Sequence, residues 1–290
     1  MYKVLYNKQI SSNSYEMLIK APMVVENCLP GQFVIVMARE DSERIPLTIY
    51  DYDKKKGNLY VIYQVIGAST EELTHVKDEI FGVLGPLGRP NEICANLDEF
   101  KGKKICYVAG GVGIAPVYPQ VKYLHKNGYD VDVIYGARNV ELLLIRDKIE
   151  KVAKKISYAT DDGSFGKKGF VTDILKEKLD NYDIIVTIGP VIMMKNVCDV
   201  TREKNVKTIV SMNPIMVDGS GMCGACRCEV DGKQMFACIH GPEFDGHKVN
   251  FDLALKRMNI YKDEEKLKWE VMKDLLLKED EAHEWWKSKR

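Results

Sequence analysis

Residues 1 to about 98 alternate between short apolar stretches and turn-forming residues. The segments 15–20 and 59–66 are rich in Val, Ile and Tyr, as strands are, and Gly85-Pro86-Leu87-Gly88 is typical turn material. Closely spaced short strands with no helical period between them favour an antiparallel barrel or sandwich. We therefore expect residues 1–98 to form a small antiparallel β-barrel.

The pattern changes at about residue 99. Buried-type strands are predicted over 105–109, 131–135, 156–160 and 184–188, and segments with helical apolar spacing lie between them. Strands that alternate with helices form βαβ units around a parallel sheet. Residues 99–212 are therefore predicted to be an α/β domain.

Both patterns stop after residue 212. Residues 213–245 are rich in Gly and Cys and have too few apolar residues for a core of their own, so we expect a ligand to hold them together. Residues 246–290 are predicted to be a charged helical extension, with an apolar stripe at Leu267, Val271, Leu275 and Leu276. Two interpretations stay open: the helix packs on its own chain, or it clasps a larger subunit with Trp285 and Trp286 as anchors.

Charge and hydropathy exclude some function classes. The 42 basic and 42 acidic residues cancel, so no overall field favours nucleic acid or a membrane surface. No apolar run approaches the roughly 20 residues that span a bilayer, and the start of the chain does not resemble a signal peptide. We expect a cytoplasmic protein whose crowded cysteines bind metal and do not form disulfides.

The cysteine spacing predicts an iron–sulfur site. Cys223-x₂-Cys226 followed by Cys238 matches three positions of the plant-type pattern C-x₄-C-x₂-C…C for a [2Fe–2S] cluster. Asp218 occupies the first position, and a carboxylate can bind ferric iron. The predicted metal ligands are Asp218, Cys223, Cys226 and Cys238, with Cys228 in place of Asp218 as the alternative. Cys-x₂-Cys also suits structural zinc, which would indicate an assembly subunit without enzymatic activity.

Glycine-rich strand ends predict a dinucleotide site. Glycines after a buried strand let a pyrophosphate approach the backbone and the start of the next helix. Ligands of open α/β sheets bind at the carboxyl ends of the strands, and the candidates there are Gly110, Gly111, Gly113, Ile114, Ala115 and Pro116; Gly136, Ala137 and Arg138; and Gly189, Pro190 and Met193.

The third strand ends in Asp161, Asp162 and Gly163. Carboxylates at this place accept hydrogen bonds from ribose hydroxyls and repel a 2′-phosphate, which predicts NAD(H) over NADP(H). The alternative interpretation is that both aspartates only cap a turn.

These motifs, with Pro30-Gly31-Gln32-Phe33 and Gly189-Pro190-x-x-Met193, resemble the ferredoxin–NADP reductase superfamily over residues 1–245. Within it the chain is similar to the electron-transfer subunits of dihydroorotate dehydrogenases. It is more similar to the small subunits of NADH-dependent reduced ferredoxin:NADP oxidoreductases, because Asp218 replaces a cysteine and the C-terminal tail is long.

The resemblance implies FAD on the barrel. The implied FAD-binding residues follow the superfamily's two flavin segments: Arg44, Pro46, Leu47 and Thr48, then Ile62, Tyr63, Gln64, Ser69 and Thr70. The motif arginine falls on Ile45, so the flavin role of Arg44 stays open. Tyr63 could contact the flavin or belong to the barrel core, and both interpretations stay open.

The resemblance also implies an activity and a partner. The chain would be an NAD(H)-linked oxidoreductase subunit in a heterodimer with a larger flavin and iron–sulfur subunit that handles ferredoxin and NADP(H), with electron bifurcation between them. A flavin can take a hydride and release single electrons, so no side-chain acid or base is assigned to catalysis.

Overall fold

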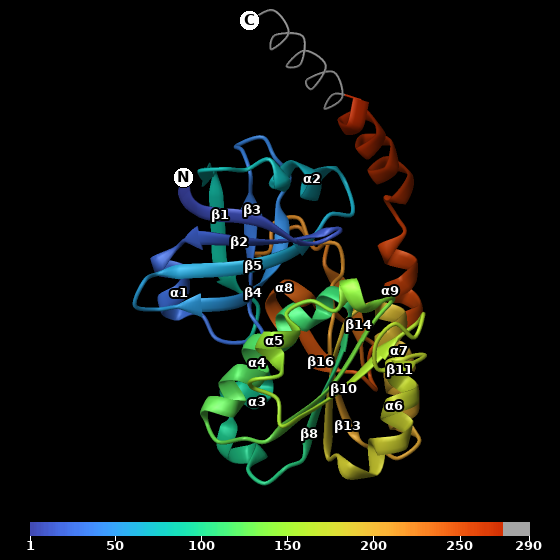
Figure 1. The fold of residues 1–290 in the computed structure, drawn as a ribbon. Helices are drawn as coiled ribbons and strands as arrows, with labels where there is room; N and C mark the ends of the chain where they lie inside the picture. The colour runs from blue at the N-terminus through green and yellow to red at the C-terminus, as the bar shows by residue number, and fades with distance from the viewer. Residues whose placement is uncertain (275–290) are drawn as a thin grey trace, which may run out of the picture.

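A computed structural model describes residues 1–274 and confirms the predicted architecture. A half-barrel of antiparallel strands lies beside a parallel sheet covered by helices, and the C-terminal extension runs along one side from the sheet towards the barrel (Figure 1). Leu275, Leu276, Trp285 and Trp286 of the predicted extension lie outside the described residues.

The half-barrel is one seven-stranded antiparallel sheet with the order β6-β1-β2-β5-β4-β3-β7. Its strands and its two short helices are β1 (Tyr2–Ser11), β2 (Ser14–Lys20), α1 (Pro22–Asn27), β3 (Phe33–Met37), β4 (Ile45–Asp53), β5 (Asn58–Gln64), α2 (Ala68–Thr74), β6 (Glu79–Ile80) and β7 (Gly82–Leu87).

The alternation of side chains on β4 and β5 gives the half-barrel two different faces. Leu47, Ile49 and Tyr63 lie in the core of the barrel, whereas Tyr50 and Ile62 belong to the cluster that includes residues of the neighbouring α/β domain. Because successive strand residues point to opposite faces, this outer face of β4 and β5 is the one directed towards the α/β domain.

The α/β domain is built on a second seven-stranded sheet with the order β11-β10-β9-β8-β12-β13-β16. Its elements up to residue 211 are α3 (Glu92–Ala95), β8 (Ile105–Gly110), α4 (Ile114–Lys126), β9 (Val131–Ala137), α5 (Arg146–Ile149), β10 (Lys155–Thr160), β11 (Lys167–Lys168), α6 (Val171–Lys178), β12 (Ile184–Ile188), α7 (Val191–Arg202) and β13 (Lys207–Ser211). In chain order the main parallel strands run 3-2-1-4-5, so the strand order reverses between β8 and β12.

Strand β8 shows why this sheet is buried on both faces. Ile105, Tyr107 and Ala109 pack in the cluster that holds the apolar side of α4, and Cys106 and Val108 pack with α6 and α7. Helices on both faces require a strand that is apolar throughout, as β8 is.

Polar contacts fix the two domains against each other. The Lys122 Nζ on α4 lies 2.7 Å from a carboxylate oxygen of Asp51 on β4. Lys148 contacts the buried carboxylate of Glu16 at 3.2 Å. Burial disfavours the charged form of Glu16, but hydrogen bonds from Tyr6 and Lys148 outweigh it and lower the pKa of this carboxyl.

The cysteine-rich segment follows β13. It contains β14 (Arg227–Val230), β15 (Lys233–Phe236), α8 (Ala237–His240) and β16 (Glu243–Asp245), and β14 and β15 form a hairpin. Strand β16 pairs antiparallel with β13, with Val210 opposite Phe244. The segment therefore leaves the sheet at β13 and returns to it as the next strand.

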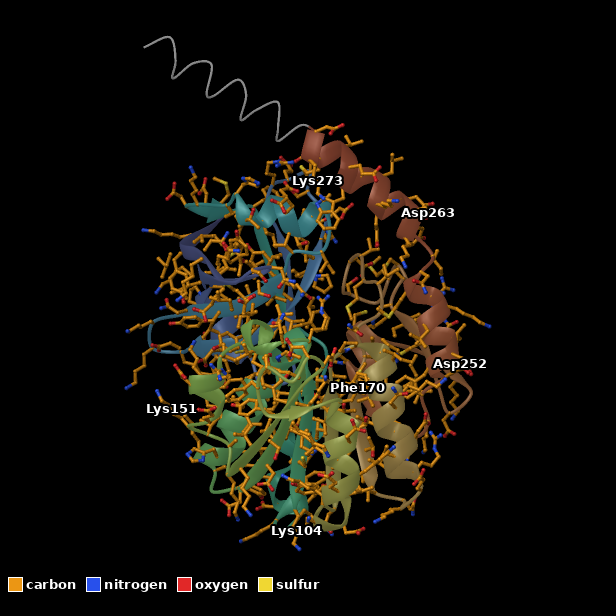
Figure 2. All side chains as sticks on the ribbon, turned by 45° about the vertical axis from the view of Figure 1, so that its right-hand side comes forward. Lys104, Lys151, Phe170, Asp252, Asp263 and Lys273 are labelled. Atoms are coloured by element: carbon orange, nitrogen blue, oxygen red, sulfur yellow. The ribbon has the colours of Figure 1, made fainter. Side chains whose placement is uncertain are left out.

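The extension begins with α9 (Phe251–Met258) and is helical again over 262–274. Asp252, Asp263 and Lys273 mark its path along the molecule (Figure 2). Lys268 forms an ion pair with Glu43 of the barrel, whereas Leu267 and Val271 are 63% and 52% exposed. The predicted stripe is thus not covered by the described part of the chain. Among residues 1–274, no helix has the length and apolarity needed to cross a bilayer.

Candidate functional site

The glycines predicted for a dinucleotide meet at the carboxyl ends of β8 and β12. A Cβ on Gly113 would lie 2.2 Å from the carbonyl oxygen of Ile188, and a Cβ on Gly110 would lie 2.4 Å from the Met193 sulfur. A Cβ on Gly189 would lie 3.1 Å from the Gly110 Cα. These glycines therefore allow two strand ends to touch at the point where the strand order reverses, the usual ligand site of such sheets.

The other predicted nucleotide residues line the same edge. Gly111 leads into α4, and Ile114, Ala115 and Pro116 form the first turn of this helix. Gly136 closes against Val171, since a Cβ there would lie 2.5 Å from its Cγ1. Ala137 ends β9 and Arg138 follows it, exposed, while Pro190 directly precedes α7.

The two aspartates after β10 differ in their surroundings. The Asp162 carboxylate accepts hydrogen bonds from the Ser164 backbone N–H at 2.9 Å and from the Ser164 hydroxyl at 2.7 Å. These bonds lower the pKa of Asp162, which matches the turn-capping interpretation for this residue. Within the described part of the chain, the Asp161 carboxylate has no such partner, and both residues and Gly163 are exposed.

The implied flavin residues divide between the two faces of the barrel. Pro46, Thr48, Ile62 and Gln64 occupy alternate positions of β4 and β5 on the outer face. Leu47 lies in the barrel core. The side chain of Tyr63 is there too, stacked on Tyr15 with its hydroxyl donating to Asn7 at 2.9 Å. Any contact of Tyr63 with a flavin would therefore come from its backbone.

The remaining implied flavin residues surround the start of α2. The Thr70 hydroxyl accepts the backbone N–H groups of Ile66 at 3.0 Å and Gly67 at 3.2 Å, and Ser69 donates to Glu43. The Thr70 hydroxyl is thus used within the turn, and the Ser69 hydroxyl is used by Glu43. Arg44 is exposed just before β4, and Ile45, which takes the place of the motif arginine, packs against the barrel core.

The structure brings the predicted metal ligands together in two pairs. The Cys226 and Cys238 sulfurs are buried and 3.1 Å apart. Asp218 approaches Cys223, whose backbone N–H donates to the carboxylate at 2.9 Å, and the Ser220 N–H donates at 2.7 Å. These bonds lower the pKa of Asp218, led by the bond from Ser220.

The pKa of Cys238 depends on residues of both pairs. Burial, the bond to Cys226 and the charge of Asp218 raise the pKa of Cys238 to about 12. A thiol with so high a pKa needs a metal to hold it as thiolate. In the range 1–274, no three His, Cys, Asp or Glu side chains converge on the position of a single ion.

Cys228, the alternative ligand, lies on the β14–β15 hairpin of the loop. It is on β14, buried in the cluster that contains Phe251 of α9, and its sulfur lies 3.8 Å from the Met235 carbonyl oxygen. Burial raises the pKa of Cys228 to about 11. Cys226 and Cys238 lie in the same cluster, and Cys228 differs from them in that its sulfur contacts a carbonyl oxygen and not a second sulfur.

Comparison with known proteins identifies two domains of this chain. Residues 213–250 match the iron–sulfur cluster binding domain of dihydroorotate dehydrogenase B, and residues 107–199 match the oxidoreductase NAD-binding domain. A chain in the solved structure of an NADH-dependent reduced ferredoxin-NADP oxidoreductase, studied for flavin-based electron bifurcation, is 37% identical with a TM-score of 0.84. The match covers 93% of this chain and 97% of that one.

This chain belongs to the ferredoxin–NADP reductase superfamily. It is an electron-transfer subunit with an oxidoreductase NAD-binding domain and an iron–sulfur domain. A dihydroorotate dehydrogenase B (NAD(+)) electron transfer subunit homolog of Thermotoga maritima is 40% identical, over 92% of this chain and 94% of that protein. An uncharacterized protein in the adh 3′ region of Clostridium beijerinckii is 48% identical over 91% and 92%. Ferredoxin–NADP⁺ reductase from Plasmodium falciparum, at 16% identity and a TM-score of 0.57, shares the fold.

A buried polar cluster in this electron-transfer subunit was missed by sequence reasoning. The Glu243 carboxyl on β16 accepts hydrogen bonds from Asn91 and from Gln120 of α4, each at 2.7 Å. Both amide side chains are fully buried. Loss of hydration raises the pKa of Glu243 to about 7. The three residues join the end of the barrel, the nucleotide-binding helix and the strand that follows the cysteine loop.

Proposed function

We propose that this subunit holds FAD on the outer face of the barrel and a [2Fe–2S] cluster in the cysteine loop, and transfers electrons between NAD(H) and a partner. The partner would be a larger flavin and iron–sulfur subunit that handles ferredoxin and NADP(H) by electron bifurcation. The observation that carries the proposal is the paired arrangement of the four predicted ligands beside an NAD-binding sheet.

The pairs suggest how the ligands are shared between two irons. Cys226 and Cys238, with sulfurs 3.1 Å apart, would bind one iron. Asp218 and Cys223, related by the bond from the Cys223 N–H, would bind the other. Two tetrahedral irons with two protein ligands each are what a [2Fe–2S] cluster requires.

The chain positions the reactants and needs no acid or base. When bound, the flavin exchanges a hydride with NAD(H) and single electrons with the cluster. Gly111, whose Cβ position is open, would let the nucleotide pyrophosphate approach the sheet. Gly110, Gly113 and Gly189 bring the two strand ends together at that place. Pro46, Thr48, Ile62 and Gln64 would hold the flavin on the face of the barrel that is turned towards this site.

Cofactor analysis tests the proposal directly. The complete chain, purified without oxygen, should contain about two irons, two sulfides and one FAD, and NADH should bleach the flavin. Zinc without iron or flavin would favour a non-enzymatic assembly subunit and overturn the proposal.

Two variants test the ligand set. Asp218→Cys should keep the cluster and change its reduction potential, because ligand identity and charge set that potential. Cys228→Ser, the matched change in the same loop, should leave iron content and potential unaltered. Loss of the cluster in Cys228→Ser, with an unchanged potential in Asp218→Cys, would instead make Cys228 the ligand.

A second candidate partner is a dihydroorotate-oxidising subunit. The match of residues 213–250 to the dihydroorotate dehydrogenase B domain and the 40% identity to the Thermotoga maritima protein favour it. Co-purification of the native complex, followed by identification of its second chain, separates the two candidates.

The exposed Leu267 and Val271 supply a surface for either partner, and we expect removal of residues 262–290 to weaken co-purification.

A further inference from the structure

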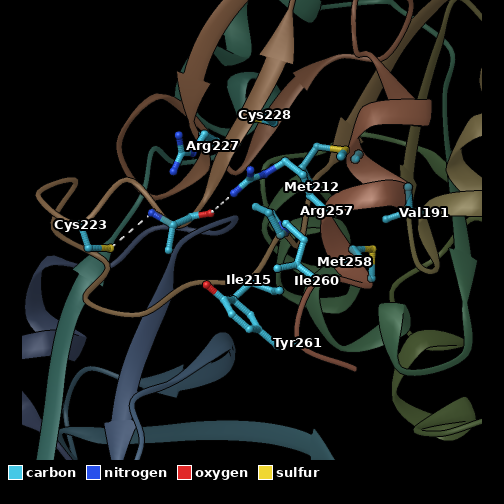
Figure 3. Close-up of a pocket in the computed structure, with 13 residues that line it drawn as sticks. Val191, Met212, Ile215, Cys223, Arg227, Cys228, Arg257, Met258, Ile260 and Tyr261 are labelled. Carbon is cyan, nitrogen blue, oxygen red and sulfur yellow. Dashed lines mark hydrogen bonds between the residues drawn. The ribbon is translucent and has the colours of Figure 1, made fainter. Parts of the chain in front are cut away.

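One side chain of the C-terminal extension bonds to the cysteine loop beside a predicted iron ligand. Arg257, near the end of α9, donates a hydrogen bond from its guanidinium to the carbonyl oxygen of Ala225 at 3.1 Å. The N–H of Ala225 donates in turn to the Cys223 sulfur at 3.5 Å. Figure 3 shows both bonds, which connect the extension through one residue to a predicted iron ligand.

The position of Arg257 is fixed by the way α9 is anchored. Asn250 caps the helix by accepting the Leu253 N–H at 3.0 Å, and its amide donates to Glu229 on β14 at 2.9 Å. Phe251 is buried in the same cluster as Cys226, Cys228 and Cys238. A helix held at its start to the hairpin that carries Cys228 delivers the residue two turns later to a defined place.

The side chain of Arg257 is half-buried beside the cysteine loop. It lines a cavity of about 170 Å³ together with Cys223, Cys228, Met212 and Ile260. Its Nε is buried and, within residues 1–274, has no hydrogen-bond partner. A half-buried positive charge acts on its neighbours more strongly than a fully exposed one.

Arg227 provides a natural contrast. It lies in the same loop, and its Nε donates to the Gly224 carbonyl oxygen at 3.1 Å. Its side chain is exposed, so solvent and salt screen its charge. The two arginines thus bond neighbouring carbonyls of one loop but differ in exposure.

We infer that Arg257 is a positioning residue for the iron–sulfur loop. It fixes Ala225 so that the Ala225 N–H meets the Cys223 sulfur, and it adds a half-buried positive charge beside the cluster. The inference rests on the proposed presence of the cluster. Both effects favour the reduced, more negative cluster, because hydrogen bonds to sulfur and net charge set its potential. The extension would then help to tune the electron carrier besides offering a surface to a partner.

The test compares three variants of the complete chain by an EPR-monitored redox titration and by the rate of iron loss to a chelator. Arg257→Gln should shift the potential to more negative values and speed iron loss several-fold. Arg257→Lys keeps the charge and should retain most of the potential. Arg227→Gln, the exposed control, should change the potential less than Arg257→Gln.

Each outcome decides the matter. Iron loss in both Arg257 variants, with a retained cluster in Arg227→Gln, supports the positioning role. An Arg257→Gln protein with the unaltered potential and iron retention overturns the inference, as do equal shifts in Arg257→Gln and Arg227→Gln. Absence of a cluster from the unaltered chain would instead overturn the proposed function.

Discussion

The nucleotide-binding sheet and the cysteine loop both depend on glycine, for opposite reasons. Gly113 has an ordinary helical φ of −59°, but a Cβ there would overlap the Ile188 carbonyl. Gly224 has a φ of +66°, and the nearest atom to its Cβ position would be in Phe236 at an ordinary 3.6 Å. The sheet uses glycine for close approach, and the loop uses it for backbone conformation. The first need is absolute, whereas the second can be met in part by other residues.

The largest effect is expected for Gly113→Ala. Its Cβ would meet backbone atoms of β12, which cannot move away, so we expect a loss of about 3 kcal/mol or more in the free energy of unfolding. Thermal and urea unfolding of the cofactor-free chain measure it. Gly67→Ala is the matched control, because that position is extended and open. Equal stability of the two variants would contradict the steric explanation.

The second prediction concerns Glu243 on β16, the strand that connects the cysteine loop to the nucleotide-binding sheet. Its pKa of about 7, against 4.5 for an ordinary glutamate, means that the folded state binds more protons than the unfolded state between these values. Stability should therefore fall as the pH rises through this window, by up to about 3 kcal/mol. Glu243→Gln should remove this part of the pH dependence, measured by urea unfolding at pH 5 and pH 8.

The cluster of Asn91, Gln120 and Glu243 can accommodate Glu243→Gln. The Gln120 carbonyl oxygen is buried without a partner among the described residues, so a flipped Gln120 could accept from the new amide. Exposed Glu99→Gln serves as the control and should keep the pH dependence. If Glu243→Gln keeps it as well, the carboxyl does not titrate in this range.

A smaller effect is expected for Gly224→Ala in the loop. Placing Ala in the left-handed region costs about 1 kcal/mol, which should speed iron loss to a chelator roughly fivefold at most. Gly224→Asn should be milder because Asn tolerates this conformation better than Ala. A complete failure of Gly224→Ala to bind iron would show that the loop has steric limits like those of the sheet.

The smallest effect concerns nucleotide choice. Asp161→Asn should reduce the preference for NADH over NADPH by up to about fivefold, since an exposed charge contributes at most about 1 kcal/mol. Steady-state reduction of the flavin by each nucleotide measures the ratio. Asp162→Asn, at the carboxylate already bound to Ser164, should change the ratio less. Equal ratios in both variants would remove Asp161 from nucleotide selection.

The local features of this chain were predictable from sequence. The parallel sheet follows from apolar runs that alternate with helical periods, and the cysteine site follows from spacing within one short segment. The core position of Tyr63 could be resolved only from its packing on Tyr15 of the neighbouring β2, because alternation alone does not say which face is inside.

Long-range contacts were not predictable. Glu243 meets Asn91 and Gln120, which are 152 and 123 residues away, and no local pattern marks a carboxyl that will be buried between amides. Arg257 looks like one of many charged residues in a helical tail. Only the path of the chain shows that its guanidinium reaches Ala225.

The return of the chain through β16 has a mechanical consequence. The cysteine-rich segment is fixed at both ends in adjacent strands of one sheet. It therefore cannot move as a rigid body in the way that a domain on a flexible linker does. Thermal motion should therefore change the gap between electron donor and acceptor very little. Any gating of electron flow would have to act on the incoming partner, because the carrier itself stays where the sheet puts it.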